Sequence, residues 1–575
     1  MALDIFVVLI YAAGMIALGW YGMRRAKTRD DYLVAGRNLG PGFYLGTMAA
    51  TVLGGASTIG TVRLGYVHGI SGFWLCGAIG LGIVGLSLFL AKPLLKLKIY
   101  TVTQVLERRY NPAARHASAL IMLVYALAML GLGWYGMRKA KSQSDFLVAG
   151  RRLGPGLYLG TMAAVVLGGA STIGTVKLGY QFGLSGLWLV FMLGLGIIVL
   201  SLVFSRQIAR LRVFTVTQVL EQRYQASSRL IGGVVMVAYD LMVAVTATIA
   251  IGSVTEVVFG IPRIPAILCG GGIVIVYSVI GGMWSLTLTD IIQFVIKTVG
   301  IFLVLLPLSI DGAGGLARMQ EVLPAGFFDL GHIGLDTILT YFLLYFFGAL
   351  IGQDIWQRVF TARSETVVRY AGLGAGVYCM LYGAACALIG AAARVLLPDL
   401  AVPENAYAEI TREVLAPGLR GLVVAAALSA IMSTASGCLL AAATVLQEDI
   451  YARFLRPGTT SDIRLSRCIT LLMGVAMLVL ACLVNDVIAA LSIAYNLLVG
   501  GLLVPIVGAL LWRRASPQGA IASIVAGCLA VIVCMARDGL LANSPIVYGL
   551  LASLATFVAV SLATRPAASL RAQPE

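Results

Sequence analysis

Apolar runs of about 20 residues recur along the whole chain, and they constrain the fold more than any other feature of the sequence. A helix of about 20 residues crosses roughly 30 Å of hydrocarbon. Hydrophobic residues make up 60% of the 575 residues and charged residues only 11%, whereas soluble chains carry about 25% charged residues. The sequence therefore excludes an ordinary soluble protein and predicts an all-α, polytopic membrane protein.

The apolar runs predict about sixteen helices. The first run follows Asp4 and precedes Arg24 and Arg25, which reverses the charge pattern of a cleaved signal peptide. We therefore expect it to be a retained helix whose N-terminus lies outside. The predicted helices are 5–23, 41–68, 71–94, 116–137, 155–182, 185–208, 228–258, 262–281, 287–309, 335–352, 370–398, 415–447, 463–485, 487–512, 518–536 and 546–565.

Positive charge gathers in alternate short loops, and this accounts for the formal net charge of +16. No basic patch with interleaved aromatic residues occurs, so we expect membrane lipid and no nucleic acid as a partner. Loops rich in Lys and Arg alternate with acidic loops from residue 138 onward, which predicts that the basic loops and the C-terminus are cytoplasmic in a cell inner membrane. The basic loops lie near 138–152, 206–212, 358–369, 453–464 and 513–514, and the acidic ones near 311–334 and 399–413.

Cysteine and histidine usage indicates neither a disulfide framework nor a metal or catalytic centre. All nine cysteines fall in apolar segments without metal-ligand spacing, and the three histidines are far apart in the sequence. We therefore expect no enzyme. The sequence does not define an oligomeric state.

A tandem repeat occupies the N-terminal part of the chain. Residues 20–66 (WYGMRRAKTRDDYLVAGRNLG…) and 134–180 (WYGMRKAKSQSDFLVAGRRLG…) are two near-copies, and the offset of 114 residues continues through 101–110 and 215–224. Three helices are an odd number, so two successive copies cannot both span the membrane in the same orientation. We expect that the first copy does not span as three ordinary helices and contributes nothing to transport. An artefact of the gene prediction is an alternative.

The segment 166–176, VLGGASTIGTV, places paired glycines inside an apolar run. Glycines weaken a helix and free backbone carbonyls, and unwound carbonyls at membrane depth are what secondary transporters use to coordinate a cation. Close packing of small residues between helices is the alternative interpretation.

A second element with cation chemistry is the segment 428–451. Ala430, Ser433 and Thr434 stand at positions i, i+3 and i+4, so they share one helix face. A carbonyl and two hydroxyls suit a hard cation that prefers oxygen ligands. The alternative is that each hydroxyl bonds back to its own helix.

Three further motifs give a resemblance to a known family. YSVIGGMWSLTLTDIIQ (277–293), GQDIWQRVFTARS (352–364) and LQEDIY (446–451), together with GASTIG (169–174), resemble in sequence and order the landmarks of the sodium/solute symporter family, which includes proline and sugar symporters. The resemblance covers about 116–565.

The resemblance implies a five-plus-five inverted-repeat transporter core, with its halves at about 155–309 and 335–512 and with extra helices at both ends. The expected domains are a duplicated three-helix block at 1–115, a flanking helix and cytoplasmic loop at 116–154, the ten-helix core at 155–512, and C-terminal flanking helices with a short tail at 513–575.

The resemblance also implies a sodium site between the first and eighth core helices. Its expected ligands are the carbonyls of Ala170, Ile173 and Ala430 and the hydroxyls of Ser433 and Thr434.

Some members of the family hold a further cation near a carboxylate on the fifth core helix, which here corresponds to Asp290. Ser436 is positioned to assist, but Gly437 lacks the hydroxyl expected there. Asp290 is an intramembrane carboxylate and hence a functional candidate; capping a helix near the cytoplasmic interface is the alternative.

The solute is predicted from departures from the family pattern. Thr172 stands where proline carriers have an acid, and Lys177, Tyr345 and Gly348 stand where sugar carriers have polar sugar contacts. A lysine at membrane depth is costly unless it is paired or hydrated. We expect a small anionic solute, such as a carboxylate, held partly by Lys177; the alternatives are that Lys177 replaces a cation or that its side chain reaches the outer interface.

These features together predict a sodium-coupled symporter that imports its solute by alternating access. Rival interpretations are a transporter-like membrane sensor, a passive channel and an inactive duplicate.

Overall fold

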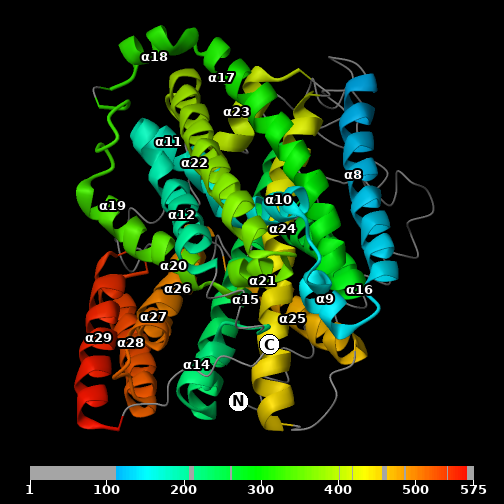
Figure 1. The fold of residues 1–575 in the computed structure, drawn as a ribbon. Helices are drawn as coiled ribbons and strands as arrows, with labels where there is room; N and C mark the ends of the chain where they lie inside the picture. Colours follow the sequence, from blue (N-terminus) through cyan, green and yellow to red (C-terminus); the bar gives the residue numbers. More distant parts are fainter. Residues whose placement is uncertain are drawn as a thin grey trace, which may run out of the picture. The chain divides into compact units, whose positions relative to one another are not determined.

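The computed structural model describes most of the chain from residue 112 onward as a bundle of helices (Figure 1). Among these residues there is no β-strand, and one isolated β-bridge joins Leu153 to Ala362. The first copy of the repeat lies outside the described residues, so the expectations about it stay predictions. The described ranges are 112–205, 213–259, 262–324, 326–400, 402–416, 419–455, 463–484, 487–540 and 542–565.

Ten helical segments in these ranges are long and apolar enough to cross a membrane. Each coincides with one or two predicted apolar runs, which confirms the all-α, polytopic prediction. One of them, Arg263–Gly312, has 50 residues and is long enough for two crossings. The other nine are Ala170–Phe204, Ala226–Glu256, Leu335–Thr361, Glu365–Leu396, Leu419–Leu455, Ile463–Leu483, Ala490–Ala509, Pro517–Asp538 and Ser544–Ala563.

The helices follow the chain in two successive groups. The first group comprises α8 (Pro112–Lys139), α9 (Gln143–Val148), α10 (Pro155–Val166), α11 (Thr175–Phe182), α12 (Trp188–Val199), α14 (Thr217–Arg223), α15 (Ala226–Phe259), α16 (Arg263–Thr298), α17 (Leu306–Gly312) and α18 (Gly315–Val322). The second comprises α19 (Leu335–Tyr341), α20 (Phe347–Ile351), α21 (Gln353–Thr361), α22 (Glu365–Leu396), α23 (Ala406–Val414), α24 (Leu419–Val445), α25 (Ile463–Leu483), α26 (Val487–Leu498), α27 (Val504–Leu511), α28 (Pro517–Asp538) and α29 (Ser544–Ala563).

Two helices in the described part of the chain, α10–α11 and α20–α21, are interrupted, and each is the first helix of one half of the core that the family resemblance predicts. The chain leaves helical geometry at Leu167, between α10 and the π-helical turn η5 (Ala170–Gly174), where φ is −87° and ψ is 65°. It leaves helical geometry again at Gly352, between α20 and α21, where φ is −62° and ψ is 132°. Interruptions at matching positions agree with the expected five-plus-five inverted repeat.

A sharp turn at Gly282 divides α16 into two helices without a loop. The sequence predicts separate helices at 262–281 and 287–309, and the structure has its non-helical residue, Gly282, at this junction. Gly282 has φ of 53°, a conformation that a glycine adopts at little cost. A Cβ atom there would lie 2.5 Å from the carbonyl oxygen of Phe146, so the close approach of α9 also requires glycine.

Basic loops gather at one end of the bundle. The Arg151 guanidinium donates to the carbonyl of Val213 at 2.8 Å, and that of Arg223 donates to the carbonyl of Arg513 at 2.9 Å. Figure 1 shows α14 near this lower end and α18, from an acidic loop, at the top. The described residues of the basic and acidic loops thus lie toward opposite ends of the bundle formed from residue 116 onward, and the cytoplasmic location of the basic end stays a prediction.

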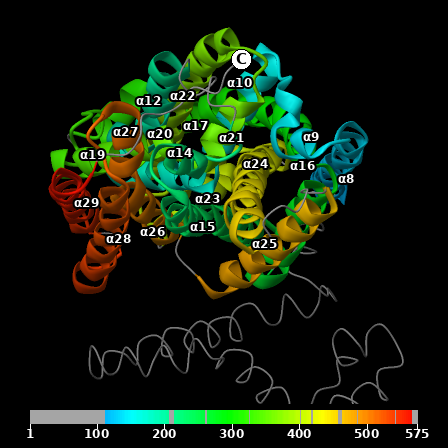
Figure 2. The same ribbon diagram turned by 60° about the horizontal axis from the view of Figure 1, so that its bottom comes forward.

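Helix α24 forms the centre of the bundle. Every residue from Val423 to Val445 is buried, and α24 packs against α10, α15, α16, α21 and α25 (Figure 2). Helices α28 and α29 instead pair with each other at the periphery. A central helix with no lipid-facing side can hold polar groups on several faces, because other helices cover each of them.

Candidate cation and solute site

The interruption after α10 lies directly against α24. A Cβ atom on Gly168 would be 2.5 Å from the Thr434 hydroxyl oxygen, and one on Gly169 would be 2.5 Å from the Ala250 side chain. Glycine at both positions therefore allows the unwound chain to pack closely between α24 and α15. The paired glycines noted in the sequence thus serve close packing directly after α10 has ended, and Leu167 is the residue that leaves helical geometry.

The last carbonyls of α10 accept hydrogen bonds from α24. The Ser433 hydroxyl donates to the carbonyls of Ala164 and Ala430, both at 2.8 Å, and the Thr434 hydroxyl donates to the carbonyl of Val165 at 2.7 Å. Carbonyls in the final turn of a helix have no partner within that helix. Two helices thus bring several backbone and hydroxyl oxygens together at one buried point.

The predicted ligand set is brought together in part. Ala430, Ser433 and Thr434 share a buried face, as their spacing predicts. The hydroxyls contact the carbonyls of Ala164 and Val165. Ala170 and Ile173 lie inside η5, and Ala170 lines the same cavity as Thr434. Sequence reasoning missed the end of α10 because it did not locate the exact residue at which the helix stops. The roles of Ala170 and Ile173 stay predictions.

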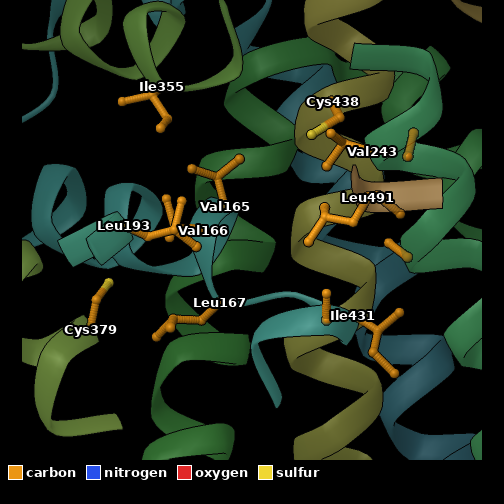
Figure 3. Packing of buried hydrophobic residues seen from close by; sticks show 14 of the residues in the cluster. Val165, Val166, Leu167, Leu193, Val243, Ile355, Cys379, Ile431, Cys438 and Leu491 are labelled. Atoms are coloured by element: carbon orange, nitrogen blue, oxygen red, sulfur yellow. The ribbon is translucent and has the colours of Figure 1, made fainter. Parts of the chain in front are cut away.

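A cavity of about 30 Å³ lies beside these oxygens. This volume holds one or two water-sized groups. Figure 3 shows Val165 and Val166 at the end of α10 and Leu193, Val243 and Leu491 on the neighbouring helices, all five of which line the cavity. Its polar lining consists of Ser171, Thr246, Asp354, Thr434 and Tyr495.

Asp354 supplies the carboxylate of the cavity and was not singled out from the sequence. It lies in the first turn of α21, directly after the interruption at Gly352. One carboxylate oxygen accepts from the Tyr239 hydroxyl at 3.2 Å, and the other lies 3.8 Å from the sulfur of Cys438. The sequence feature that could have identified Asp354 is the acid in the GQDIWQ motif (352–357). The sequence analysis used this motif only as a family landmark.

Two predicted residues of the interrupted helix, Thr172 and Lys177, do not line the cavity. The hydroxyl of Thr172 lies 2.9 Å from that of Tyr382, so this residue contacts α22. Lys177 is half-buried on α11 and is not among the residues that line the cavity. Its predicted contact with the solute therefore stays a prediction.

The possible second cation site centres on Asp290, which is fully buried in α16. Its carboxylate accepts from the Thr161 hydroxyl at 2.5 Å and lies 3.6 Å from the guanidinium of Arg358. The Ser436 hydroxyl donates to the carbonyl of Ser433 in its own helix at 3.1 Å. Arg358 is thus a partner of Asp290 that the sequence alone did not reveal.

A model of the sodium:solute symporter family matches residues 146–527. The chain belongs to this family. It is 28% identical to the sodium/pantothenate symporter of Escherichia coli (strain K12) over 469 residues, which cover 76% of this chain and 95% of that protein. It is 25% identical to the osmoregulated proline transporter OpuE of Bacillus subtilis (strain 168), with 77% of this chain and 94% of that protein covered.

Among solved structures, a Na⁺-coupled sialic acid symporter in its substrate-bound outward-open state has the same fold. The two structures superpose with a TM-score of 0.71 at 20% sequence identity. The superposition covers 79% of this chain and 99% of the sialic acid symporter. Membership of the sodium:solute symporter family identifies the present chain as a multi-pass membrane transporter for a small-molecule solute, with sodium as the coupling ion. The predictions of class, fold, coupling ion and absence of enzymatic function are thereby confirmed.

Proposed function

We propose that this symporter imports a small carboxylate-bearing solute across a bacterial inner membrane by alternating access. The observation that carries the proposal is the contact between the hydroxyl face of α24 and the open end of α10, next to a cavity that contains an acid. The alternating basic and acidic loops support the inner membrane as its location.

Sodium binds where α10 ends against α24. Hydroxyl and carbonyl oxygens are the ligands that a hard cation prefers. Ser433 and Thr434 now donate to carbonyls, and rotation of each hydroxyl turns an oxygen lone pair toward an ion. Because the ligands come from two helices, the affinity for sodium depends on how closely those helices approach. A cation drives transport only if it binds the two states differently, and this arrangement supplies that difference.

The solute carries a carboxylate together with a hydrogen-bond donor. Pantothenate, proline and sialic acid, which the relatives named above transport or bind, each contain a carboxyl group and an O–H or N–H donor. Ala170 and Ser171, at the start of η5, line the cavity, and the start of a half-helix suits the carboxylate of a solute. Asp354 only accepts hydrogen bonds when ionised, so it suits an ammonium or hydroxyl group of the solute.

Lys177 acts in the approach of the solute from outside. It lies on the outer half of the interrupted helix according to the loop charges, beyond the cavity lining. Its positive charge attracts a carboxylate before the solute reaches the start of η5. This position agrees with an anionic group on the solute without requiring direct contact in the closed cavity.

Uptake by purified protein in proteoliposomes tests the proposal. The panel contains proline, pantothenate, sialic acid and propionate, which has a carboxylate but no further donor, each with an inward sodium gradient, an inward proton gradient or neither. We expect concentrative uptake of a solute with both groups, and only with the sodium gradient. Equilibration without concentration would indicate a channel, and uptake of uncharged analogues in preference to carboxylates would contradict the proposed solute class.

A further inference from the structure

We propose that sodium binding releases a proton from Asp240, a buried acid of α15, and that a proton on Asp240 takes the place of sodium when the empty carrier returns. The inference rests on the proposed function in that sodium binds at the α10–α24 contact and that transport proceeds by alternating access. It adds a second ligand, the proton, and a site for that proton which is not among the residues that line the cavity.

The first observation is that Asp240 is buried without a hydrogen-bond donor. Its side chain has no exposed surface, and neither carboxylate oxygen has a hydrogen-bond partner among the described residues. The charged groups that face it are Asp354 and Arg358 of α21, and the neutral ones are Tyr239 of its own helix and Cys438 of α24. The backbone amide of Asp354 is close to the carboxylate but not in hydrogen-bonding geometry. A carboxyl group in such a place is costly when ionised and binds a proton instead.

The second observation is that the two neighbouring buried acids have partners that Asp240 lacks. Asp354 accepts from the Tyr239 hydroxyl at 3.2 Å and lies in the first turn of α21, where the helix dipole favours a negative charge. The carboxylate of Asp290 lies 3.6 Å from the guanidinium of Arg358. Of these three acids, Asp240 is therefore the one that binds a proton most readily.

The third observation is the charge of the buried groups taken together. Three acids (Asp240, Asp290 and Asp354) and two bases (Lys297 and Arg358) are buried in the middle of the described bundle, and the other buried acids and bases of the described residues lie in or near the basic loops. With all five ionised, the group has one excess negative charge, and an uncharged Lys297 would make the excess larger. A charge sealed inside the membrane must be compensated within the protein. A sodium ion or a proton supplies that compensation.

The fourth observation is the position of Asp240 between the cavity and the basic end of the bundle. Asp240 lies about one helical turn from Val243, which lines the cavity together with Asp354 and Thr434. In the other direction, Arg229 at the start of α15 is about 16 Å away along the helix axis. A sodium ion beside Thr434 shares the cavity with Asp354, so its charge favours the ionised form of Asp240. Opening of the basic end brings water to Asp240 from the other side.

Sodium and the proton thus compensate the same excess charge in turn. When the cavity is open to the outside, sodium binds and Asp240 gives its proton to the outer water. After sodium and solute have left at the basic end, Asp240 takes a proton from the water there, and the empty carrier returns without an excess charge. Each cycle carries one proton outward. Because the two bound states exclude each other, sodium and the proton each weaken the binding of the other by the same factor.

Equilibrium binding of radioactive ²²Na⁺ to the purified full chain, without solute and over a range of pH, tests the inference. We expect the dissociation constant for sodium to rise by up to about tenfold for each unit that the pH falls, because one proton must leave for one ion to bind. Addition of sodium chloride, but not of choline chloride, should release protons into a weakly buffered solution. Asp240→Asn has no proton to exchange, and its sodium affinity should not depend on pH. Asp336→Asn, at an exposed acid of α19, is the matched control and should keep the pH dependence.

Circular dichroism and monodisperse elution in detergent establish that each variant is folded. A sodium affinity of the natural protein that does not change with pH would overturn the inference, whether or not the variants fold. A folded Asp240→Asn variant with the pH dependence of the natural protein would also overturn it, because another group would then exchange the proton.

A pH indicator enclosed in proteoliposomes reports the direction in which the proton moves. Sodium-driven uptake by the natural protein should make the interior more alkaline, and Asp240→Asn should abolish this change. An unchanged interior, or one that becomes more acidic, would overturn the outward movement of a proton. Failure of the proposed function is a different result, namely no sodium bound by the natural protein at any pH.

Discussion

Two polar sites lie one helical turn apart on α24, and they solve the problem of charge in a membrane differently. At Ser433 and Thr434 the groups are neutral hydroxyls that meet neutral carbonyls of α10. At Gly437 the helix instead makes room for Arg358, which is paired with Asp290. A neutral site gains charge when an ion arrives and loses it when the ion leaves, whereas a paired site has the same charge throughout. The first site is suited to a transported ion and the second to a permanent contact.

The largest effect is expected when the charged site loses one partner. Arg358→Gln leaves Asp290 buried and ionised without its cation, and breaking a buried pair in this way costs roughly 3–5 kcal/mol of stability. We expect a much lower midpoint of thermal unfolding in detergent and no sodium-dependent uptake. Arg369→Gln, at an exposed position on α22, is the matched control and should change the midpoint little. Equal midpoints for the two variants would show that the pair does not stabilise the fold.

Substitutions of Ser433 and Thr434, at the neutral site, should change the affinity for sodium rather than the stability of the fold. Loss of one oxygen ligand costs about 1–1.5 kcal/mol, so Ser433→Ala and Thr434→Ala should each weaken apparent sodium affinity about tenfold. The sodium dependence of initial uptake measures this effect. Ser436→Ala removes a hydroxyl that donates to the carbonyl of Ser433 in its own helix, and it should leave sodium affinity unchanged. If Ser436→Ala weakens sodium binding as strongly as the other two, the separation into two sites is wrong.

Asp354 lies between the two sites, since it borders the cavity with Thr434 while its backbone carbonyl accepts from Arg358 at 3.4 Å. Asp354→Asn removes a charge-assisted contact worth about 1.5–3 kcal/mol, so the half-saturation concentration of the solute should rise tenfold or more. Asp336→Asn, an exposed acid in the first turn of α19, is the control. An increase in the sodium requirement with unchanged solute affinity would assign Asp354 to the ion instead of the solute.

Substitution of Lys177 should have the smallest effect on solute uptake, because this residue is half-buried and is not among the residues that line the cavity. Long charged side chains in such positions contribute about 0–1 kcal/mol, so Lys177→Gln should raise the half-saturation concentration of the solute up to about fivefold. Sodium affinity should change less. Lys177→Arg keeps the charge and should retain solute affinity. Equal uptake of a neutral solute by the natural protein and by Lys177→Gln would contradict an anionic solute.

The apolar runs predicted most of the described membrane helices because their length is set by the bilayer. The positions of polar residues along α24 predicted that Ala430, Ser433 and Thr434 share a face, since helix periodicity alone decides this. The exact end of α10 at Val166 was not predicted. Helix ends depend on which neighbouring groups donate hydrogen bonds to the freed carbonyls, and those donors lie about 270 residues further along the chain.

The sequence by itself determined the class of fold, the family and the hydroxyl-bearing face of α24. It did so because hydropathy, periodicity and motif order are local properties of the chain. Only the tertiary structure brought Arg358 to Asp290, opened the space at Gly437 and placed Asp354 at the cavity. Each of these contacts joins residues from different helices, and no periodic pattern encodes which charges meet. Burial then gives these contacts their importance, because a charge within the membrane must find its partner inside the protein.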